Sequence, residues 1–303
     1  MSVKRLLPLP IALLLLANAE PAKHDAPIPP EIQKMLDAAM ASGNEGDLST
    51  IIKYARTAAP DSADTIERLT KLWRDQRQAA TTAHLQEAGL LDLVKGHAEL
   101  GGTITSGNSD IIGLSGALKL ERDGLWWRHK VTLQADYQET NGVTSRERYL
   151  AAYEPNLKLG ARAYIYGALQ YENDRFSGFH SRYSVSSGAG YSVLTKPNLK
   201  LDLELGPAFR STSFTDGHDE TNVAARGSAD LRWKLSPGIS FTQNASAYLQ
   251  QANSTVASRS SLNVRLFGPF STQLSYALQY ESQPGDARKT TDTTSRAALV
   301  VDF

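Results

Sequence analysis

One histidine lies where it could take part in nucleophilic catalysis. Lipases built on β-barrels place a His and a Ser on the outer face of adjacent strands, with a polar residue orienting the His. Of the six histidines, His129 alone lies deep inside a stretch that we expect to be a strand, on the same face as Trp127 and Val131. No nearby serine with an orienting partner can be identified. We therefore assign no catalytic residue and predict that the protein is not an enzyme.

A second candidate is the acidic segment 215–220, which contains Asp216, His218, Asp219 and Glu220. Carboxylates and an imidazole could ligate a divalent cation, but the same composition is typical of a solvated loop. The chain has no cysteine, which excludes disulfides, thiolate metal sites and a lipoprotein anchor. We predict a solvated loop, and we assign neither a metal site nor a cofactor.

Charged side chains recur at every second position of many segments, which would place them on one face of a strand. We expect this face to line the lumen of a barrel, where charges of both signs must pair or stay hydrated. The candidate lumen residues are Lys119, Arg128, Lys130, Asp136, Arg162, Glu172, Lys200, Asp202, Glu204, Arg210, Arg226, Asp230, Arg232 and Arg296.

The region 96–303 has a period of two throughout, as in Leu199, Leu201 and Leu203 against Lys200 and Asp202. We expect about twelve antiparallel strands, an even number. They are placed at 97–105, 112–121, 127–137, 146–154, 162–172, 183–193, 199–210, 223–234, 239–249, 256–267, 270–280 and 289–303.

The links between these strands suggest which face meets lipid. Tight links are expected at 122–124, 154–156, 196–198, 236–238 and 268–269. They alternate with longer links at 140–145, 173–181, 211–220, 251–255 and 282–288, although the first outer link, 106–110, is compact. Short periplasmic turns, longer outer loops and aromatic residues near the strand ends are typical of outer-membrane barrels. The fold class predicted is an all-β transmembrane up-and-down antiparallel barrel preceded by a small α-helical module.

The chain ends on an aromatic residue, Phe303, after alternating Ala297, Leu299 and Val301. A closed barrel needs a last strand that pairs with the first and removes both edges. We expect Phe303 to be the signal by which the barrel-assembly machinery recognises this strand. The expected partners are this machinery and the lipid of the cell outer membrane.

The first 95 residues have a different pattern. The short apolar run 6–17, after Lys4 and Arg5, predicts a signal peptide at 1–19, since about 18 apolar residues are needed to span a membrane. Residues 20–95 read as a Pro-rich spacer and three amphipathic helices, expected at 30–43, 47–57 and 63–88. This periplasmic module either docks to an unidentified partner or serves only as a spacer, and the barrel follows at 96–303.

Composition sets further limits. Lysine plus arginine and aspartate plus glutamate are both 32, so no excess charge favours nucleic acid as a partner. The mean hydropathy of −0.34 is compatible with a barrel, because barrels hide only every second strand residue in lipid.

Several motifs in the barrel region carry a resemblance. They are Gly101 with 105–109 (TSGNS), 118–122 (LKLER), 146–149 (RERY), 171–176 (YENDRF) and 188–191 (GAGY). Residues 96–303 resemble the salt-induced outer-membrane protein family, a domain of unknown function, in which Thr usually stands at the place of Ser109. The resemblance implies an outer-membrane β-barrel and no established catalytic residue.

Three functions remain open. The chain could be an envelope-integrity or small-solute pore protein with a charged lumen, a closed structural barrel that anchors the helical module, or a lipase-type outer-membrane enzyme. Charge pairing that fills the lumen favours the closed barrel. An open water path favours the pore.

Overall fold

The computed structural model describes residues 26–89, 91–107, 110–251, 253–284 and 289–303. The expected signal peptide and residues 20–25 of the spacer lie outside this range, as do Asn108 and Ser109 of the first hairpin motif.

The N-terminal part is helical, as its apolar spacing predicts. Its elements are α1 Pro30–Ser42, α2 Glu45–Ala58, the 3₁₀ turn η1 Pro60–Ser62 and α3 Ala63–Glu87. Leu36, Leu48 and Ile66, one from each α-helix, are fully buried and form the centre of one apolar cluster. The first compact unit of the chain ends at Thr81. Among the described residues, no helix combines the length and apolar character needed to cross a membrane.

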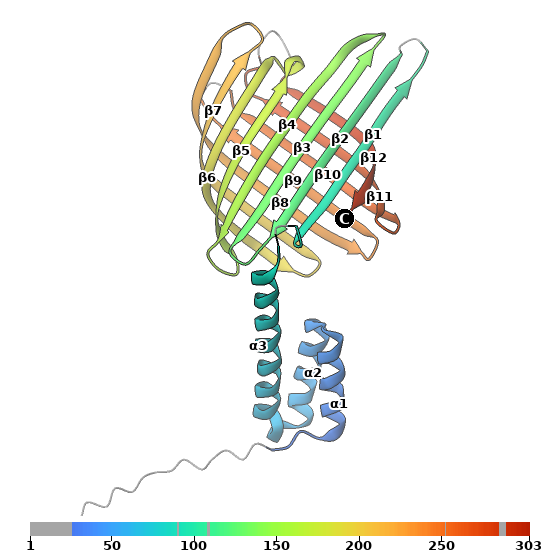
Figure 1. Ribbon diagram of the computed structural model, residues 1–303, viewed down its shortest axis with the longest axis vertical. Helices are drawn as coiled ribbons and strands as arrows, with labels where there is room; N and C mark the ends of the chain where they lie inside the picture. The colour runs from blue at the N-terminus through green and yellow to red at the C-terminus, as the bar shows by residue number, and fades with distance from the viewer. Residues whose placement is uncertain (1–25, 90, 108–109, 252, 285–288) are drawn as a thin grey trace, which may run out of the picture. The chain divides into compact units, whose positions relative to one another are not determined.

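The second unit is a closed antiparallel barrel of twelve strands in which each strand pairs with its sequence neighbours (Figure 1). The strands are β1 Val94–Thr105, β2 Ile111–Asp123, β3 Trp127–Thr140, β4 Val143–Lys158, β5 Ala163–Asp174, β6 Phe179–Lys196, β7 Leu199–Phe214, β8 Asp219–Ser236, β9 Ile239–Leu249, β10 Thr255–Phe267, β11 Phe270–Glu281 and β12 Thr291–Asp302. The predicted fold class is confirmed.

The barrel closes between β1 and β12. Four residue pairs form this ladder, from His97 opposite Asp302 to Leu100 opposite Leu299. Next to it, the amide of Gly96 donates to the carbonyl of Phe303 at 2.6 Å, and the amide of Phe303 donates back at 3.0 Å. The residue at the chain end therefore extends the closing ladder by one pair.

Residues that face each other across a ladder share a face of the sheet, so the register assigns every strand position to the inside or the outside. Buried Glu99 and Asp136, for example, belong to one continuous inner face. On β7, Asp202 and Glu204 are buried, whereas Leu203 and Leu205 are 42% and 68% exposed. The barrel is thus polar inside and apolar outside.

Several of the longer links expected from the sequence are largely strand. β3 and β4 meet in the two-residue turn Asn141–Gly142, with φ of 52° and 75°, and not in a loop over 140–145. An Asn-Gly pair with positive φ at both positions is the preferred two-residue hairpin turn. The links between β5 and β6 and between β7 and β8 shrink to 175–178 and 215–218. The longest connection, 282–290, joins β11 to β12.

The tight link expected at 154–156 is wrong. β4 runs through Pro155, and the chain turns at 159–162. Proline has no amide hydrogen to donate, and the β4–β5 ladder is interrupted where Pro155 lies opposite Gly167. Pro207 of β7 lies within a similar interruption of the β6–β7 ladder. Each proline is accommodated by a local gap in strand pairing.

Candidate functional site: a charged lumen

All the predicted lumen residues except Arg162 lie in strands on the inner face defined by the register. Arg162 lies in the turn before β5 and is exposed. Its place at an even-numbered position suggested a lumen side chain, but the strand begins one residue later. Lys200 faces inward opposite Arg232 but is exposed near the turn.

An ion pair crosses the whole barrel near the short turns. Arg232 of β8 places Nη1 3.3 Å from Oε2 of Glu121 on β2. In a ring of twelve strands, β2 and β8 are six places apart and therefore lie opposite each other. The side chains of these two residues consequently meet across the lumen.

Two further ion pairs cross the lumen beside it. Arg128 Nη1 lies 3.8 Å from Asp202 Oδ2, and Lys130 Nζ lies 3.6 Å from Asp230 Oδ2. Asp202 and Asp230 face each other on neighbouring strands, an arrangement that is repulsive by itself. The two cations from β3 offset this repulsion. Together with Arg232–Glu121, these pairs and those of Arg226 form what we call the crossing lattice.

Arg226 is the most enclosed cation of the crossing lattice. Its Nη1 donates to Glu204 Oε2 at 2.9 Å, and its Nη2 lies 3.8 Å from Oε1 of Glu154 on β4. The hydroxyl of Tyr164 donates to Glu204 at 3.2 Å, and the Arg226 guanidinium lies 5.0 Å from the ring centre of Tyr166. The hydrogen bond to Glu204, the carboxylate of Glu154 and the ring of Tyr166 thus surround this buried charge.

A second group of charges lies nearer the longer links. Arg182 of β6 reaches Glu281 of β11 at 3.3 Å, and Arg148 reaches Glu172 at 3.3 Å. Arg148, Arg182 and Glu281 were missing from the sequence prediction. Each lies on the inner face by register. Arg182 and Glu281 lie just beyond the strand ends expected from the sequence, so longer strands would have included them. Arg148 lies inside the expected strand 146–154, where the alternation is less regular.

A third group lies beside the closing ladder. Glu99, 4% exposed, has Lys119 Nζ and Arg259 Nη1 each at 3.3 Å and His97 Nε2 at 3.2 Å. Arg296 Nη2 donates to Asp136 Oδ1 at 2.6 Å. Lys119 and Arg296 were predicted, whereas Glu99 and His97 were not assigned to the lumen from the sequence.

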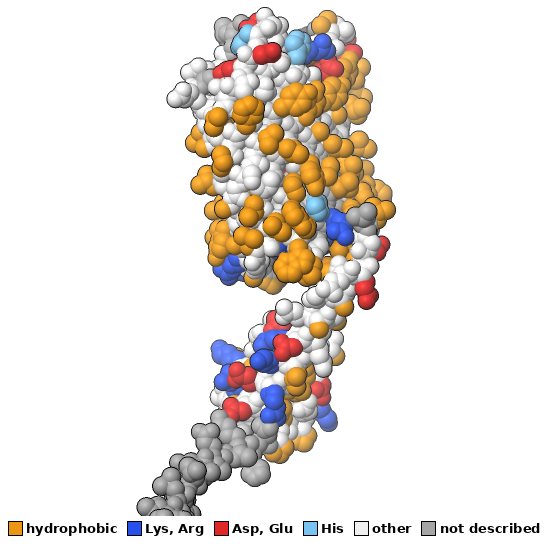
Figure 2. Space-filling view, turned by 60° about the vertical axis from the view of Figure 1, so that its left-hand side comes forward, with side chains coloured by type: hydrophobic (Ala, Val, Ile, Leu, Met, Phe, Trp, Pro, Cys, Tyr) orange, Lys and Arg blue, Asp and Glu red, His pale blue; other side chains and the backbone are white. Residues whose placement is uncertain are grey.

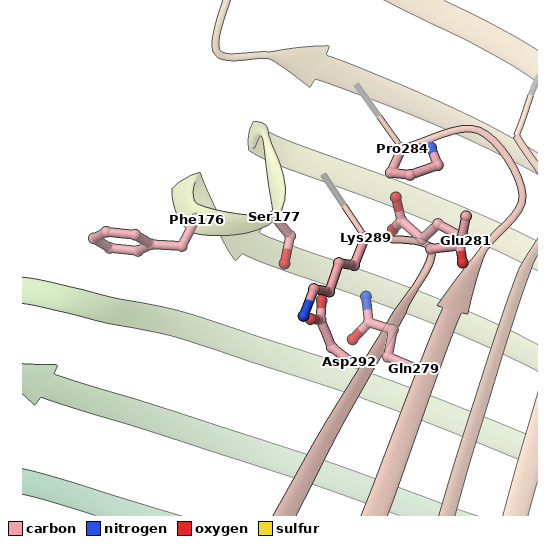
Figure 3. Close-up of a pocket in the computed structure, with 8 residues that line it drawn as sticks. Phe176, Ser177, Gln279, Glu281, Pro284, Lys289 and Asp292 are labelled. Carbon is pink, nitrogen blue, oxygen red and sulfur yellow. The ribbon is translucent and has the colours of Figure 1, made fainter. Parts of the chain in front are cut away.

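A cavity of about 400 Å³ opens at the end of the barrel that carries the longer links. Figure 3 shows Lys289, Asp292 and Gln279 close together on one side, with Glu281 beside them and Phe176 and Ser177 opposite. Side chains of both charge signs face this space. Its chemistry suits hydrated solutes and not apolar ligands.

The exterior of the barrel is apolar between its ends. Figure 2 shows one side, where hydrophobic side chains cover the middle and charged ones gather near the two ends of the barrel. Trp127 and Trp233 lie toward the short turns, and Tyr137 and Tyr183 toward the other end. An apolar band between aromatic residues, around a charged interior, is the arrangement of a membrane-spanning barrel.

His129 belongs to this exterior. Its ring stacks between Trp127 and Tyr153, with both centroids at 6.0 Å, and its Nδ1 lies 2.9 Å from the Tyr153 hydroxyl. The contacts of its imidazole are aromatic side chains. His129 is therefore a residue of the aromatic belt at this end of the wall.

The acidic loop after β7 folds on itself. Asp216 accepts hydrogen bonds from the backbone amide and ring of His218, and these hold the pKa of the Asp216 carboxyl below its usual range. No group of three or more potential metal ligands occurs among the described residues.

The barrel sequence also has relatives. Residues 98–303 match the profile of a family described as protein of unknown function, DUF481. The chain belongs to the DUF481 family. This confirms the predicted membership of a β-barrel family of unknown function. The chain is 26% identical over 197 residues to the uncharacterised protein YdiY of Escherichia coli K12, an alignment covering 64% of this chain and 76% of YdiY.

Solved structures similar to this DUF481 chain include outer-membrane proteins. The NanC porin is 11% identical, with a TM-score of 0.45, covering 68% of this chain and 99% of the porin. An outer-membrane channel from Pseudomonas putida F1 is 11% identical, with a TM-score of 0.44 and coverages of 69% and 95%.

Proposed function

We propose that the protein is an outer-membrane barrel whose lumen is closed to solutes by ion pairs, and that it anchors the helical module on the periplasmic side. The observation that carries the proposal is the contact of Arg232 with Glu121, which joins opposite strands at 3.3 Å. Arg128–Asp202 and Lys130–Asp230 add bridges beside it. Charged side chains that meet across a lumen leave little free cross-section for a solute.

The membrane location is supported by the apolar band and the buried charges. The assignment of the short turns to the periplasmic side is supported by the first and last strands of the barrel, because β1 starts and β12 ends on that side. We expect the protein to fractionate with outer membrane and to migrate differently on gels before and after heating. Recovery from the soluble periplasm would contradict the location.

The closed state is tested by conductance in a planar lipid bilayer. We expect the wild-type barrel to show no steady conductance, because its bridges span the lumen. Removing both members of two bridges, in E121A/R232A with R128A/D202A, should produce open events without leaving an unpaired buried charge at those four positions.

The control for this experiment is an ion pair that does not cross the lumen. Arg175 and Glu147 pair at 2.6 Å, Arg175 lying in the link after β5 and Glu147 on the outer face of β4. R175A/E147A should behave like wild type. Steady conductance of the wild-type barrel would contradict closure and favour a small-solute pore.

The pore alternative rests on one observation, the polar cavity lined by Lys289, Asp292 and Glu281 at the end of the barrel with the longer links. Such an entrance would concentrate small hydrated solutes. In that case the wild type should conduct, and K289A should change its selectivity between cations and anions.

The helical module is proposed to contact an unidentified periplasmic protein. Met35, Tyr54 and Leu72 are 52%, 64% and 54% exposed, which is high for large apolar side chains in a small module. A photo-crosslinking residue at Tyr54 in intact cells should yield a defined adduct, whereas the same residue at exposed Glu67 should not. Equal or absent labelling would favour a simple spacer.

A further inference from the structure

The lipid-facing wall is not uniformly apolar. On β7 the outward positions 199, 201, 203 and 205 are all leucine, as expected for a surface that meets lipid. On β9, β10, β11 and β12 the outward set instead includes Gln243, Ser258, Ser260, Tyr276 and Ser295. Polarity on the outside is thus concentrated on one third of the ring, a set of four neighbouring strands.

Four of these residues form a continuous row across the wall. Gln243 pairs with Ser260, Ser260 with Tyr276, and Tyr276 with Ser295 in consecutive ladders. Every member carries a hydroxyl or an amide. We call Gln243, Ser260, Tyr276 and Ser295 the polar row.

The polar row lies at the depth of the hydrocarbon. On β11, the outward residue Tyr276 stands between Phe270 at the short-turn end and Tyr280 at the other end. Aromatic residues at these places mark the membrane interfaces, so lipid headgroups lie beyond them. Acyl chains offer the row no hydrogen-bonding group.

Part of the row lacks a partner within the barrel. The amide of Gln243 donates to Ser258 at 2.7 Å and accepts from Ser260. No hydrogen bond of the Tyr276 or Ser295 side chain occurs among the described residues, and Tyr276 is 49% exposed. Burying these groups in lipid alone would cost free energy that a polar partner would recover.

A recess of about 520 Å³ follows the row on the outside of the barrel. Ser260, Tyr276 and Ser295 line it, and so do Phe241, Leu262 and Leu274 of the same outer face. The recess therefore combines polar and apolar side chains, as the central part of a contact between membrane proteins would require.

The barrel closure is also shortest beside this row. The β1–β12 ladder stops at Leu100 opposite Leu299, so Ser295 lies in a part of β12 without a paired β1 residue. Ile104, near the outer end of β1, is 86% exposed. Two short exposed strand edges thus adjoin the polar row, and such edges are costly in lipid unless covered.

We propose that a second copy of this chain packs against this wall, with polar row against polar row about a two-fold axis along the membrane normal. Hydroxyl and amide groups both donate and accept, so the row is complementary to itself. The proposal rests on the outer-membrane location argued above. A membrane lipid is the less suitable occupant because its polar groups lie outside the depth of the row.

Cysteine cross-linking in isolated membranes tests the interface, and the chain has no native cysteine to interfere. With a membrane-permeable oxidant, S260C or Y276C should give a disulfide-linked dimer, because these central members lie nearest the two-fold axis. L169C is the matched control on β5: Leu169 faces outward and is 50% exposed, against 49% for Tyr276. It should remain monomeric.

A heat-modifiable, outer-membrane monomer without cross-links in S260C and Y276C would overturn the dimer and leave the location intact. Equal cross-linking of L169C would overturn it as well, since collision would then explain the product. A protein absent from the outer membrane would instead overturn the location on which the proposal rests.

A second measurement removes the row without cysteines. S260A/Y276F/S295A should weaken dimerisation on the order of tenfold in detergent, since each membrane-buried hydrogen bond contributes modestly. L169A should leave the dimer unchanged. Unchanged dimerisation of the triple variant would show that the row is not the interface.

Discussion

Two tyrosines of β5 show how hydrogen bonding determines whether a buried hydroxyl stabilises or destabilises the fold. Tyr164 and Tyr166 both face inward and are 5% and 1% exposed. The Tyr164 hydroxyl donates to Glu204, whereas that of Tyr166 has no hydrogen-bond partner within the described structure. A buried hydroxyl without a partner loses its hydration and gains nothing in return.

Replacing each tyrosine with phenylalanine should therefore change the free energy of unfolding in opposite directions. Y166F should stabilise the barrel by about 1 kcal/mol, and Y164F should destabilise it by about 1–2 kcal/mol, because Glu204 then loses a donor. Urea unfolding in lipid vesicles, followed by tryptophan fluorescence, measures both. Equal effects would mean that the Tyr166 hydroxyl is bonded in the membrane, for instance through water.

Many of the inward charges could be predicted residue by residue, but their pairing could not. Alternation alone places Arg232 and Glu121 on one face of their strands. Nothing in the sequence says that side chains 111 residues apart meet, because this depends on the strand number and the shape of the lumen. The inward tyrosines were missed because only charged residues were assigned to the inner face from the sequence.

The closing ladder is the shortest ladder of the barrel among the described residues. It has four pairs, whereas the β1–β2 ladder has twelve. Phe303 adds two backbone hydrogen bonds with Gly96, and its ring covers that glycine so closely that a Cβ there would lie 2.2 Å from ring atoms. An aromatic ring over a glycine on the neighbouring strand is a device that fixes register.

We predict that F303A lowers the yield of heat-modifiable barrel severalfold in outer membranes. Phe267 supplies the control, because it is also an aromatic residue near the short turns and is 69% exposed against 66% for Phe303. F267A should assemble nearly as well as wild type. Equal yields of the two variants would remove the assembly role of the chain end.

Strand boundaries were the least predictable part of the fold, for two reasons. Pro155 was taken as a turn signal because proline is rare inside strands, yet a gap in pairing opposite Gly167 accommodates it. Asn141–Gly142 carried the right hairpin signal, which the surrounding polar residues obscured. Helix positions were easier to predict from the sequence, since apolar spacing and a leading proline define α1 directly.

At the scale of the whole molecule, the decisive property is which face of the wall meets water. A soluble barrel buries apolar residues and exposes charges. Here Glu99, Glu204 and Arg210 are at most 5% exposed, while Leu205 and Phe209 are at least 50% exposed. An arrangement of this kind is stable only if lipid covers the outside and ion pairs or water fill the inside.

An arginine placed on each face tests this arrangement directly. L203R puts a charge on the outer face of β7, where it should cost about 2–4 kcal/mol near the bilayer midplane. A257R puts the same side chain on the inner face of β10, at an exposed position opposite Ser246 and Gln279. There it can remain hydrated, so the free energy of unfolding should change by less than about 1 kcal/mol. The measurement is urea unfolding in vesicles. If L203R left the free energy of unfolding unchanged while A257R strongly lowered it, the outer face would meet water. The membrane location would then have to be abandoned.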